Sequence, residues 1–365
     1  MTNNSTASPG RLANFDDLRL AFAAMVLFSH SFALLGVADP IRSVVTGGGD
    51  PGALAVDGFF LISGYLITKS WLSDPSVPRF LTKRALRLYP AFIVASIISV
   101  FIVGPLGATV VGDYFRELNL TQVLPGLLVL RDPHTPAVFA GMPVGSVNGS
   151  MWTISFEARC YLLAMLLGLA GLLRKRTALL ILTVIAGFAI SYSVPEAGPT
   201  DNQHLLFGMK ALRVSDFMAW FAALFLTGSC FFVFRNRIRF TLWGLILAMC
   251  VLTASLFNAA LLRPGILLGG AYVVFALASM TGASRAHRRT MPDVSYGMYL
   301  YGWPVQKLLS WYIPHMSPWL MFFLSLAISV AVGWLSWTYI ERPALKKKPR
   351  QPVTHPREME MADAG

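Results

Sequence analysis

Residues 318–339 read PWLMFFLSLAISVAVGWLSWTY, a stretch of 22 residues without one charged side chain. A helix needs about 20 mostly apolar residues to cross the hydrocarbon core of a bilayer. The whole chain has a similar character, because 55% of its 365 residues are hydrophobic and 13% are charged. A soluble domain carries about 25% charged residues. The sequence therefore predicts an integral membrane protein.

Further apolar runs approach the length of a membrane-spanning helix. They cover residues 18–37, 52–72, 88–108, 150–172, 177–194, 216–234, 240–258, 262–281 and 293–312. The segment 121–130 is too short to cross and contains Pro125, so we expect an interfacial or re-entrant piece there. The sequence thus predicts an all-α integral membrane protein, a bundle of about ten transmembrane helices.

Lysines and arginines are spread unevenly over the connections between these runs. With the N-terminus placed inside, the inner segments hold 20 of them and the outer loops hold 6. Cytoplasmic loops carry an excess of these residues, so we expect both termini to be cytoplasmic. Residues 1–345 are predicted to form the transmembrane domain, and residues 346–365 a short basic and polar cytoplasmic tail without fixed structure.

Composition also argues against several other classes of protein. The net charge of +12 falls in short clusters between apolar runs, which is not the single basic stripe of a nucleic-acid-binding protein. The three cysteines lie far apart inside apolar runs, so they predict neither a metal site nor a redox pair. A polar N-terminus followed by an apolar run of about 20 residues predicts no cleaved signal peptide.

Few ionisable residues fall inside the predicted spans, where each costs at least ~2.5 kcal/mol. Arg19 and His30 are eleven residues apart, close to three helical turns, so they share one face with about 16 Å of axial rise between them. The same helical rise places Glu157 at the depth of His30, with Asp57 slightly shallower. Such groups are functional by default. The structural alternatives are a satisfied interhelical His30, a snorkelling Arg19 and an Asp57 that only pairs inside the bundle.

A basic cluster precedes the third predicted span. The stretch RFLTKRALRLYP, residues 79–90, places Lys83, Arg84 and Arg87 at helical spacing on the inner side. Paired guanidiniums suit phosphate oxygens, so the cluster is a candidate site for a phosphorylated cytoplasmic ligand. The alternative is the ordinary positive-inside excess or contact with lipid headgroups.

The segment SVNGSMWTISFEARCYLL, residues 146–163, runs from a Gly- and Asn-containing outer loop into the fourth predicted span. It carries Trp152, Ser155 and Glu157. A Trp at a membrane interface is ordinary. An acid inside a membrane span is unusual, so Glu157 is a candidate functional residue.

Together, several segments resemble the acyltransferase 3 family, membrane enzymes that move acyl groups, usually acetyl, from cytoplasmic acyl-coenzyme A to sugars of envelope polysaccharides, lipopolysaccharide or signalling oligosaccharides. The likeness extends over essentially the whole chain, and the order and spacing of the segments make it specific. The segments are LRLAFAAMVLFSH at 18–30, AVDGFFLISGYLI at 55–67, RALRLYP at 84–90, MWTISFEARCYLL at 151–163, VSYGMYLYGWPV at 294–305 and IERPA at 340–344.

The resemblance implies a multi-pass O-acyltransferase of the bacterial inner membrane, with acetyl-coenzyme A as donor, no metal, and a carbohydrate acceptor at the outer face. It implies that the phosphates of the coenzyme meet Lys83, Arg84 and Arg87, while Arg19 guides the pantetheine arm.

The resemblance also assigns candidate catalytic roles. His30 would be a general base or a transient acyl carrier, and the sequence leaves that choice open. Glu157 would orient the imidazole and stabilise its charged form, with Asp57 helping or holding its own helix. A further set is expected to support substrate or local structure: Trp152, Ser155 and Tyr89.

Other classes of protein remain as alternatives. A secondary transporter of a small anionic or sugar-like substrate would also be a helical bundle with buried ionisable groups. It usually has broken helices in two corresponding halves, a pattern that the sequence does not show. A scaffold or receptor would not need His30, Asp57 and Glu157 at similar depth. Among enzymes, the alternatives are another donor, such as succinyl-coenzyme A, or a non-sugar acceptor.

Overall fold

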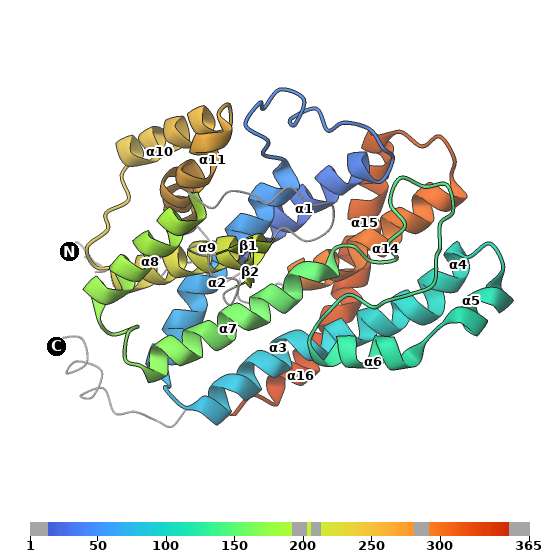
Figure 1. Cartoon of the computed structure of the whole chain (residues 1–365), viewed down its shortest axis with the longest axis horizontal. Helices are drawn as coiled ribbons and strands as arrows, with labels where there is room; N and C mark the ends of the chain where they lie inside the picture. Colours follow the sequence, from blue (N-terminus) through green and yellow to red (C-terminus); the bar gives the residue numbers. More distant parts are fainter. Residues whose placement is uncertain (1–13, 192–202, 206–212, 281–291, 350–365) are drawn as a thin grey trace, which may run out of the picture.

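The computed structural model describes residues 14–191, 203–205, 213–280 and 292–349, and helices make up most of these segments (Figure 1). Every predicted apolar run contains a helix or helical segments joined end to end. They are α1 (Phe15–Ala33), α2 (Pro51–Ser73), α3 (Val77–Ile98) with α4 (Gly104–Gly107), α7 (Ile154–Leu169), α8 (Arg176–Ser191), α9 (Asp216–Val233), α10 (Leu242–Ser255), α11 (Ala259–Gly265) with α12 (Ala271–Ser279), α14 (Ser295–Tyr312), and α15 (Pro318–Ser336) with α16 (Arg342–Lys346).

Among the described residues, five helices are long and apolar enough to cross a membrane. They are Pro51–Ser73, Val77–Gly107, Met151–Leu169, Ala259–Ser279 and Pro318–Lys346. Shorter apolar helices cover Arg176–Gly187, Phe217–Val233 and Leu242–Ser255. The structure thus supports a helical membrane protein. Ten crossings and the cytoplasmic position of both termini stay predictions.

One short ribbon departs from the all-α prediction. Strands β1 (Gln203–Leu205) and β2 (Arg213–Ser215) pair in antiparallel fashion, with Gln203 opposite Ser215. Both strands lie in the connection that precedes α9. Three-residue strands are too short to leave an alternating pattern in a sequence, so there was no signal for them.

Helix α2 is surrounded by α1, α7, α9 and α12. It meets α9 backbone to backbone. A Cβ atom at Gly64 would lie 1.9 Å from the carbonyl oxygen of Phe225, and one at Gly228 would lie 2.0 Å from that of Leu61. Small residues allow membrane helices to approach closely enough for van der Waals contacts to hold them together. This packing fixes the helix that carries Val56 and Asp57.

Gln306 fixes α14 against α1. Its Nε2 donates hydrogen bonds of 2.8 Å to the carbonyl oxygen of Leu27 and of 2.8 Å to the hydroxyl of Ser31. One turn earlier, a Cβ atom at Gly302 would lie 2.6 Å from the Leu27 side chain, so glycine allows the close approach. These contacts hold α14 against the last two turns of α1, where His30 lies.

Three of the helical rods contain a π-helical turn in their described parts: η1 (Ser99–Val103), η4 (Ile266–Gly270) and η5 (Trp337–Glu341). Such turns disturb the regular helix locally and are frequent at functional sites. Turn η5 joins α15 to α16 and ends at Glu341, whose exposed fraction is 2%. Because η5 packs against α3, this buried carboxylate lies beside the basic cluster of that helix.

The long connection after α4 contains α5 (Val111–Glu117) and α6 (Leu120–Leu128), which run alongside α3 and α4 (Figure 1). Helix α6 occupies the segment expected to be interfacial or re-entrant. Lys307 ties the later part of this connection to α14. Its ammonium donates a hydrogen bond to the carbonyl oxygen of Val144 and lies 4.5 Å from the centre of the Phe139 ring.

Candidate active site

A cavity of about 320 Å³ lies between α1, α2, α3, α7 and α14, and we call it the basic cavity. Its wall carries the cations Arg19, Arg84, Arg87 and Lys348 and the acids Glu157 and Asp293. The fold thus brings together three of the four residues predicted to hold a coenzyme. Arg19 comes from α1 and the other two come from α3.

Two carboxylates hold the guanidinium of Arg87. Its Nη2 lies 2.8 Å from Asp293 and its Nη1 lies 3.5 Å from Glu341, while the group stacks 5.4 Å from the centre of the Tyr296 ring. Burial alone would raise the pKa of Asp293, but the charges of Arg87 and Arg19 bring this pKa to about 2. Arg87 is therefore fixed in place, and its charge is largely balanced.

Arg84 is less fully satisfied than Arg87. Its Nη2 donates to the hydroxyl of Ser70 at 3.3 Å, and its guanidinium lies 5.6 Å from the ring centres of both Phe80 and Tyr161. Its Nε is buried and has no hydrogen-bond partner among the described residues. Leaving a buried donor unpaired costs about 1–3 kcal/mol. An oxygen of an anionic ligand in the basic cavity would satisfy it.

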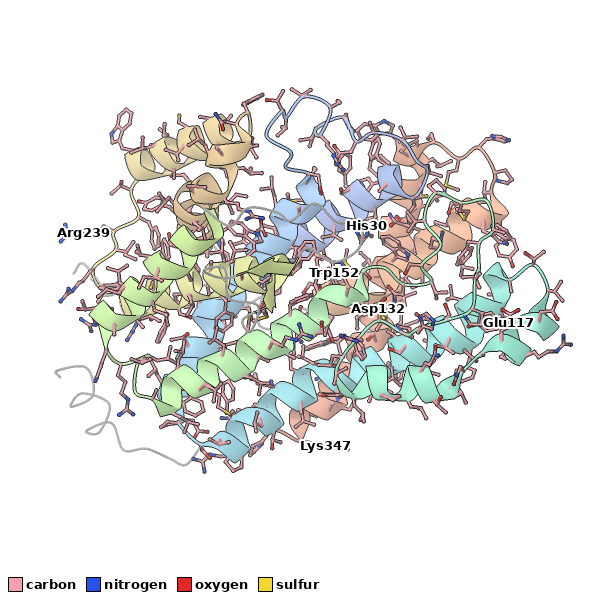
Figure 2. All side chains as sticks on the ribbon, in the orientation of Figure 1. His30, Glu117, Asp132, Trp152, Arg239 and Lys347 are labelled. Carbon is pink, nitrogen blue, oxygen red and sulfur yellow. The ribbon has the colours of Figure 1, made fainter. Side chains whose placement is uncertain are left out.

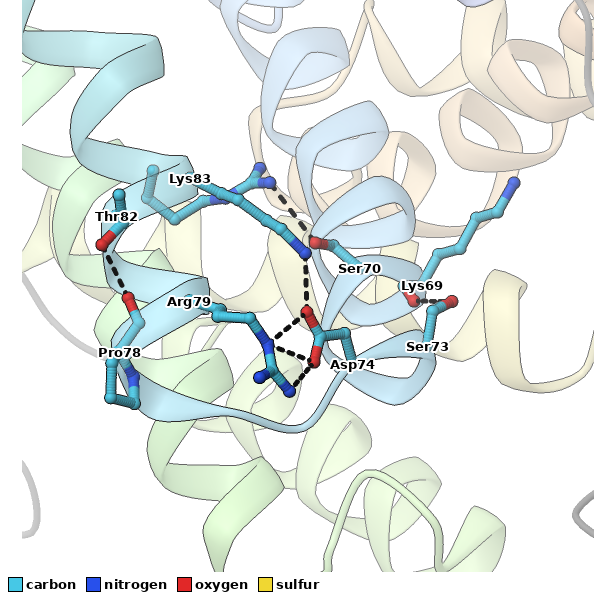
Figure 3. A network of polar contacts seen from close by, with 9 residues as sticks. Lys69, Ser70, Ser73, Asp74, Pro78, Arg79, Thr82 and Lys83 are labelled. Atoms are coloured by element: carbon cyan, nitrogen blue, oxygen red, sulfur yellow. Dashed lines mark hydrogen bonds and ion pairs between the residues drawn. The ribbon is translucent and has the colours of Figure 1, made fainter. Parts of the chain in front are cut away.

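Lys83, the fourth predicted coenzyme-binding residue, is not on the wall of the basic cavity as the described residues define it. Its ammonium lies 2.7 Å from Asp74, which also pairs with Arg79 at 2.6 Å (Figure 3). Hydrogen bonds from Arg79 and Lys83 hold the pKa of Asp74 below its ordinary value. Lys83 shares a helix face with Arg87 but lies one turn nearer the start of α3, where Asp74 binds it.

A second, larger cavity of about 700 Å³ contains His30, and we call it the His30 cavity. Nδ1 of His30 is buried and lacks a hydrogen-bond partner within the described part of the chain. The imidazole meets Trp303 edge to face, with ring centres 4.7 Å apart. Figure 2 shows His30 and Trp152 near the middle of the molecule. An unpaired imidazole nitrogen beside a cavity is available to bind a substrate or to take its proton.

Three acids line the His30 cavity, Asp39, Asp50 and Asp57, and the sequence analysis had singled out Asp57. Asp57 is buried and accepts a hydrogen bond of 2.8 Å from Nε1 of Trp220, which joins α2 to α9. Arg263 lies 5.7 Å from the centre of the Trp220 ring. The structure therefore places His30 and Asp57 on one cavity, as their predicted depths suggested.

Asp50 is another of these three acids, and sequence analysis did not single it out. Its carboxylate caps the start of α2 by accepting from the backbone N–H of Ala53 at 2.9 Å, and it accepts from the hydroxyl of Ser29 at 3.1 Å. Ser29 precedes His30, and the Asp50 charge acts on the imidazole. In the sequence, Asp50 is an acid directly before Pro51, and this pattern is typical of the start of a helix and does not indicate catalysis.

Glu157 lies on the wall of the basic cavity, so the structure does not place it beside His30 on the other cavity. Its carboxylate accepts a hydrogen bond of 2.5 Å from the hydroxyl of Tyr161. The predicted depth says nothing about rotation around the helix axis. Trp152 and Glu157 are five residues apart, which turns the side chain by about 140°. Trp152 accordingly faces the His30 cavity and Glu157 the basic cavity.

The residues expected to give support have different surroundings. Trp152 packs against Phe217 with ring centres 4.8 Å apart, on the wall of the His30 cavity. Ser155 is buried and donates to the carbonyl oxygen of Trp152 at 3.1 Å. The Tyr89 hydroxyl donates to the carbonyl oxygen of Leu128 in α6 at 2.6 Å. Ser155 and Tyr89 thus brace the backbone, whereas Trp152 faces a cavity.

The two cavities meet at Val56 and Tyr299, which line both of them. The Tyr299 hydroxyl lies 2.5 Å from that of Thr153, and the Ser150 hydroxyl donates to the Tyr299 carbonyl oxygen at 2.9 Å. Tyr299 is thereby held at its side chain and at its backbone. A molecule that binds in the basic cavity and reacts at His30 has to reach the junction that these two residues form.

These features define a class of protein: a helical membrane protein in which a cation-lined cavity adjoins a cavity that a buried histidine lines. The sequence model of the acyltransferase 3 family, described as an acyltransferase domain, matches residues 12–338. The chain belongs to the acyltransferase 3 family. Within its described residues, no group of three or more His, Cys, Asp or Glu side chains is arranged to hold a metal ion.

Two relatives resemble the chain over most of its length. The chain is 27% identical to an O-acetyl transferase of Shigella phage Sf6 over 350 residues, which cover 91% of this chain and 96% of the phage protein. It is 28% identical to nodulation protein 10 of Rhizobium leguminosarum bv. viciae over 366 residues, which cover 93% of this chain and 95% of that protein. No solved structure matches the chain.

Sequence analysis gave no role to Asp293, Tyr299 and Glu341, although all three contribute to the site. Tyr299 and Glu341 lie inside segments that carried the family resemblance, VSYGMYLYGWPV and IERPA. Their position in these two segments was the feature of the sequence that could have identified both residues. Asp293 lies just before the first of these segments, in a short polar stretch where an acid is ordinary.

Proposed function

We propose that this protein transfers an acetyl group from cytoplasmic acetyl-coenzyme A to a hydroxyl of a cell-envelope or exported carbohydrate. The observation that carries the proposal is the position of His30, which has a buried Nδ1 without a partner among the described residues and lines a cavity that meets a cation-lined one. The family supplies the reaction class, and the relative called an O-acetyl transferase makes acetyl the first acyl group to test. In this proposal the basic cavity opens on the cytoplasmic side of a bacterial inner membrane, and the excess of Lys and Arg on the inner side of membrane proteins supports that orientation.

The donor would enter the basic cavity with its phosphates toward the arginines. Arg84 has a buried donor to offer, and Arg19 adds a second charge from α1. Arg87, already paired with Asp293, contributes a fixed geometry more than free charge. Glu157, bonded to Tyr161, borders Arg84 and limits the excess of positive charge around it. The pantetheine arm then extends toward Val56, and the thioester reaches the junction of the two cavities.

The acceptor would enter the His30 cavity. Trp152 and Trp220 offer flat apolar surfaces there, and the acids Asp50 and Asp57 offer hydrogen-bond acceptors. A mostly apolar pocket with a few convergent polar groups is typical of a small-molecule site, and this combination suits a sugar ring with its hydroxyls.

Two forms of the reaction use the same histidine, and both remain in the proposal. As a general base, His30 takes the proton of the acceptor hydroxyl while its oxygen attacks the thioester carbonyl carbon. The ester C–O bond forms, the C–S bond breaks, and coenzyme A leaves as a thiol after receiving the proton. As an acyl carrier, the imidazole attacks the thioester carbonyl carbon, the C–N bond forms as the C–S bond breaks, and coenzyme A leaves as a thiol with the proton of the imidazole. The acceptor hydroxyl then attacks the acetyl-imidazole, the ester C–O bond forms as the C–N bond breaks, and the hydroxyl proton returns to the imidazole. In either form Asp50 stabilises the imidazolium.

The test is binding of acetyl-coenzyme A to the detergent-purified protein, because it requires no knowledge of the acceptor. Arg84→Ala removes a cation of the basic cavity, and Lys83→Met is its matched control, since Asp74 holds that neighbouring cation elsewhere. A lost charge-assisted hydrogen bond is worth about 1.5–3 kcal/mol, so we expect about tenfold weaker binding or more for Arg84→Ala. Lys83→Met should bind like the wild type. Absence of binding by well-folded wild-type protein would overturn the proposal and favour a transporter.

A further inference from the structure

Two side chains on packed helices, Val56 and Tyr299, form the junction between the two cavities, and both are held more firmly than a side chain on a loop. Val56 lies on α2, whose backbone is packed directly against α9. A Val side chain on a helix has one strongly preferred rotamer, so it cannot turn aside easily. Tyr299 is 7% exposed, and its ring packs edge to face on Phe59 with centres 5.9 Å apart. The bonds to Thr153 and Ser150 hold it from the other side.

The chemistry places one part of the donor at this junction. If the coenzyme is held by the cations of the basic cavity and reacts at His30, its arm leads to the place where the cavities meet, and we place the thioester carbon there. The acyl chain, which is attached to that carbon, then lies against Val56 and Tyr299. A bulky and well-supported wall has little room for extra methylene groups, because overpacking forces side chains off their rotamers.

We infer that Val56 and Tyr299 set the length of the acyl chain that this protein accepts, and that they select acetyl over longer chains. The inference rests on the proposed function, since it concerns which acyl-coenzyme A occupies the same site. One extra methylene group in a tight pocket changes selectivity by about 10- to 200-fold. The wall is made by two residues from different helices, so a change at either one should alter the length preference.

The experiment measures the affinities of coenzyme A, acetyl-coenzyme A and butyryl-coenzyme A for the detergent-purified full chain. In the wild type we expect butyryl-coenzyme A to bind at least about tenfold more weakly than acetyl-coenzyme A. Val56→Ala should reduce this difference to about two- or threefold, and Val56→Leu should instead weaken acetyl-coenzyme A binding. Coenzyme A itself, which lacks the acyl group, should bind equally to all three proteins.

One control variant and one second test make the result specific. Leu66→Ala changes an apolar residue that lines the basic cavity away from the junction, so the ratio of acetyl to butyryl affinity should stay as in the wild type. Tyr299→Phe keeps the ring and removes the bond to Thr153, and it should shift the ratio in the same direction as Val56→Ala, by a smaller factor. If residue 56 had a purely structural role, Ala and Leu at this position would not change the binding of acyl-coenzyme A in opposite ways.

The outcomes separate this inference from the proposed function. If coenzyme A binds but the ratio of acetyl to butyryl affinity is the same in the wild type, Val56→Ala and Val56→Leu, the inference is wrong and the proposed function stands. If coenzyme A and its acyl forms all fail to bind the folded wild type, the proposed function falls and the inference falls with it.

Discussion

The guanidinium of Arg87 lies 2.8 Å from the carboxylate of Asp293, a residue 206 positions further along the chain. Glu341 approaches the same guanidinium at 3.5 Å. Helix α3, the residues before α14 and the π-helical turn η5 therefore share one charge cluster. Removing one member of a buried pair leaves an uncompensated charge, which costs more than the pair itself contributed. The cluster is thus a structural joint of the basic cavity as well as part of its wall.

Arg87→Ala should destabilise the protein by about 3–5 kcal/mol, because it strands two carboxylates. Asp293→Asn alone should cost less, since Arg87 keeps Glu341. In the double variant the losses should fall short of their sum, because the carboxylate stranded by the first change is gone. Unfolding of the four proteins in the same detergent measures this. Strictly additive losses would show that the two side chains do not interact. Because Arg87→Ala also destabilises the protein, Arg84→Ala is the cleaner test of coenzyme binding.

Asp293 also gives the protein a defined response to acid. Its pKa in the folded protein is about 2, below the ordinary value of 3.8. A lowered carboxyl pKa contributes stability that is present above 3.8 and is lost as the pH falls toward 2, here ~2 kcal/mol in all. The stability of the wild type relative to Asp293→Asn should be constant from pH 7 to about pH 5 and should shrink below about pH 4. A difference that disappears already near pH 6 would contradict this assignment.

His30→Ala should abolish measurable acetyl transfer while leaving the fold and acetyl-coenzyme A binding nearly unchanged. A positioned base contributes about 10² to 10⁴ in rate. The control is His134→Ala, which changes an exposed histidine of the connection between α6 and α7 and should keep full activity. The readout is release of coenzyme A in the presence of an acceptor extract from the bacterial envelope, together with the thermal unfolding midpoint. Full activity in His30→Ala would exclude both catalytic forms considered above.

Gly64→Ala should separate α2 from α9. The new Cβ atom would lie 1.9 Å from a backbone oxygen, and backbone cannot move aside as a side chain end can. We expect a loss of about 3 kcal/mol or more, with weaker coenzyme binding because α2 lines both cavities. Gly112→Ala is the matched control, since its Cβ has no described atom within 4 Å and alanine favours a helix. Equal stability of the two variants would show that the helices do not pack as closely as described.

Much of the fold could be predicted from the sequence because its signals are local. An uninterrupted apolar run marks a helix in a membrane wherever it occurs, and helices occupy all the predicted runs. The shared face of Arg19 and His30 also follows from helical geometry alone. By contrast, the pairing of Lys83 with Asp74 could not be predicted, because it depends on which carboxylate a flexible side chain meets. The position of Glu157 was missed because depth in a membrane does not specify rotation around a helix.

The sequence by itself determined the class of protein, the helical segments and the residue types available for chemistry, since composition and periodicity act within single segments. The tertiary structure decided which of those residues meet. It placed Arg19, Arg84 and Glu157 on the basic cavity and His30 and Asp57 on the other, and it joined both cavities at Val56 and Tyr299. The reason is physical: contacts between distant segments depend on the rotation and close packing of whole helices, which no local pattern encodes.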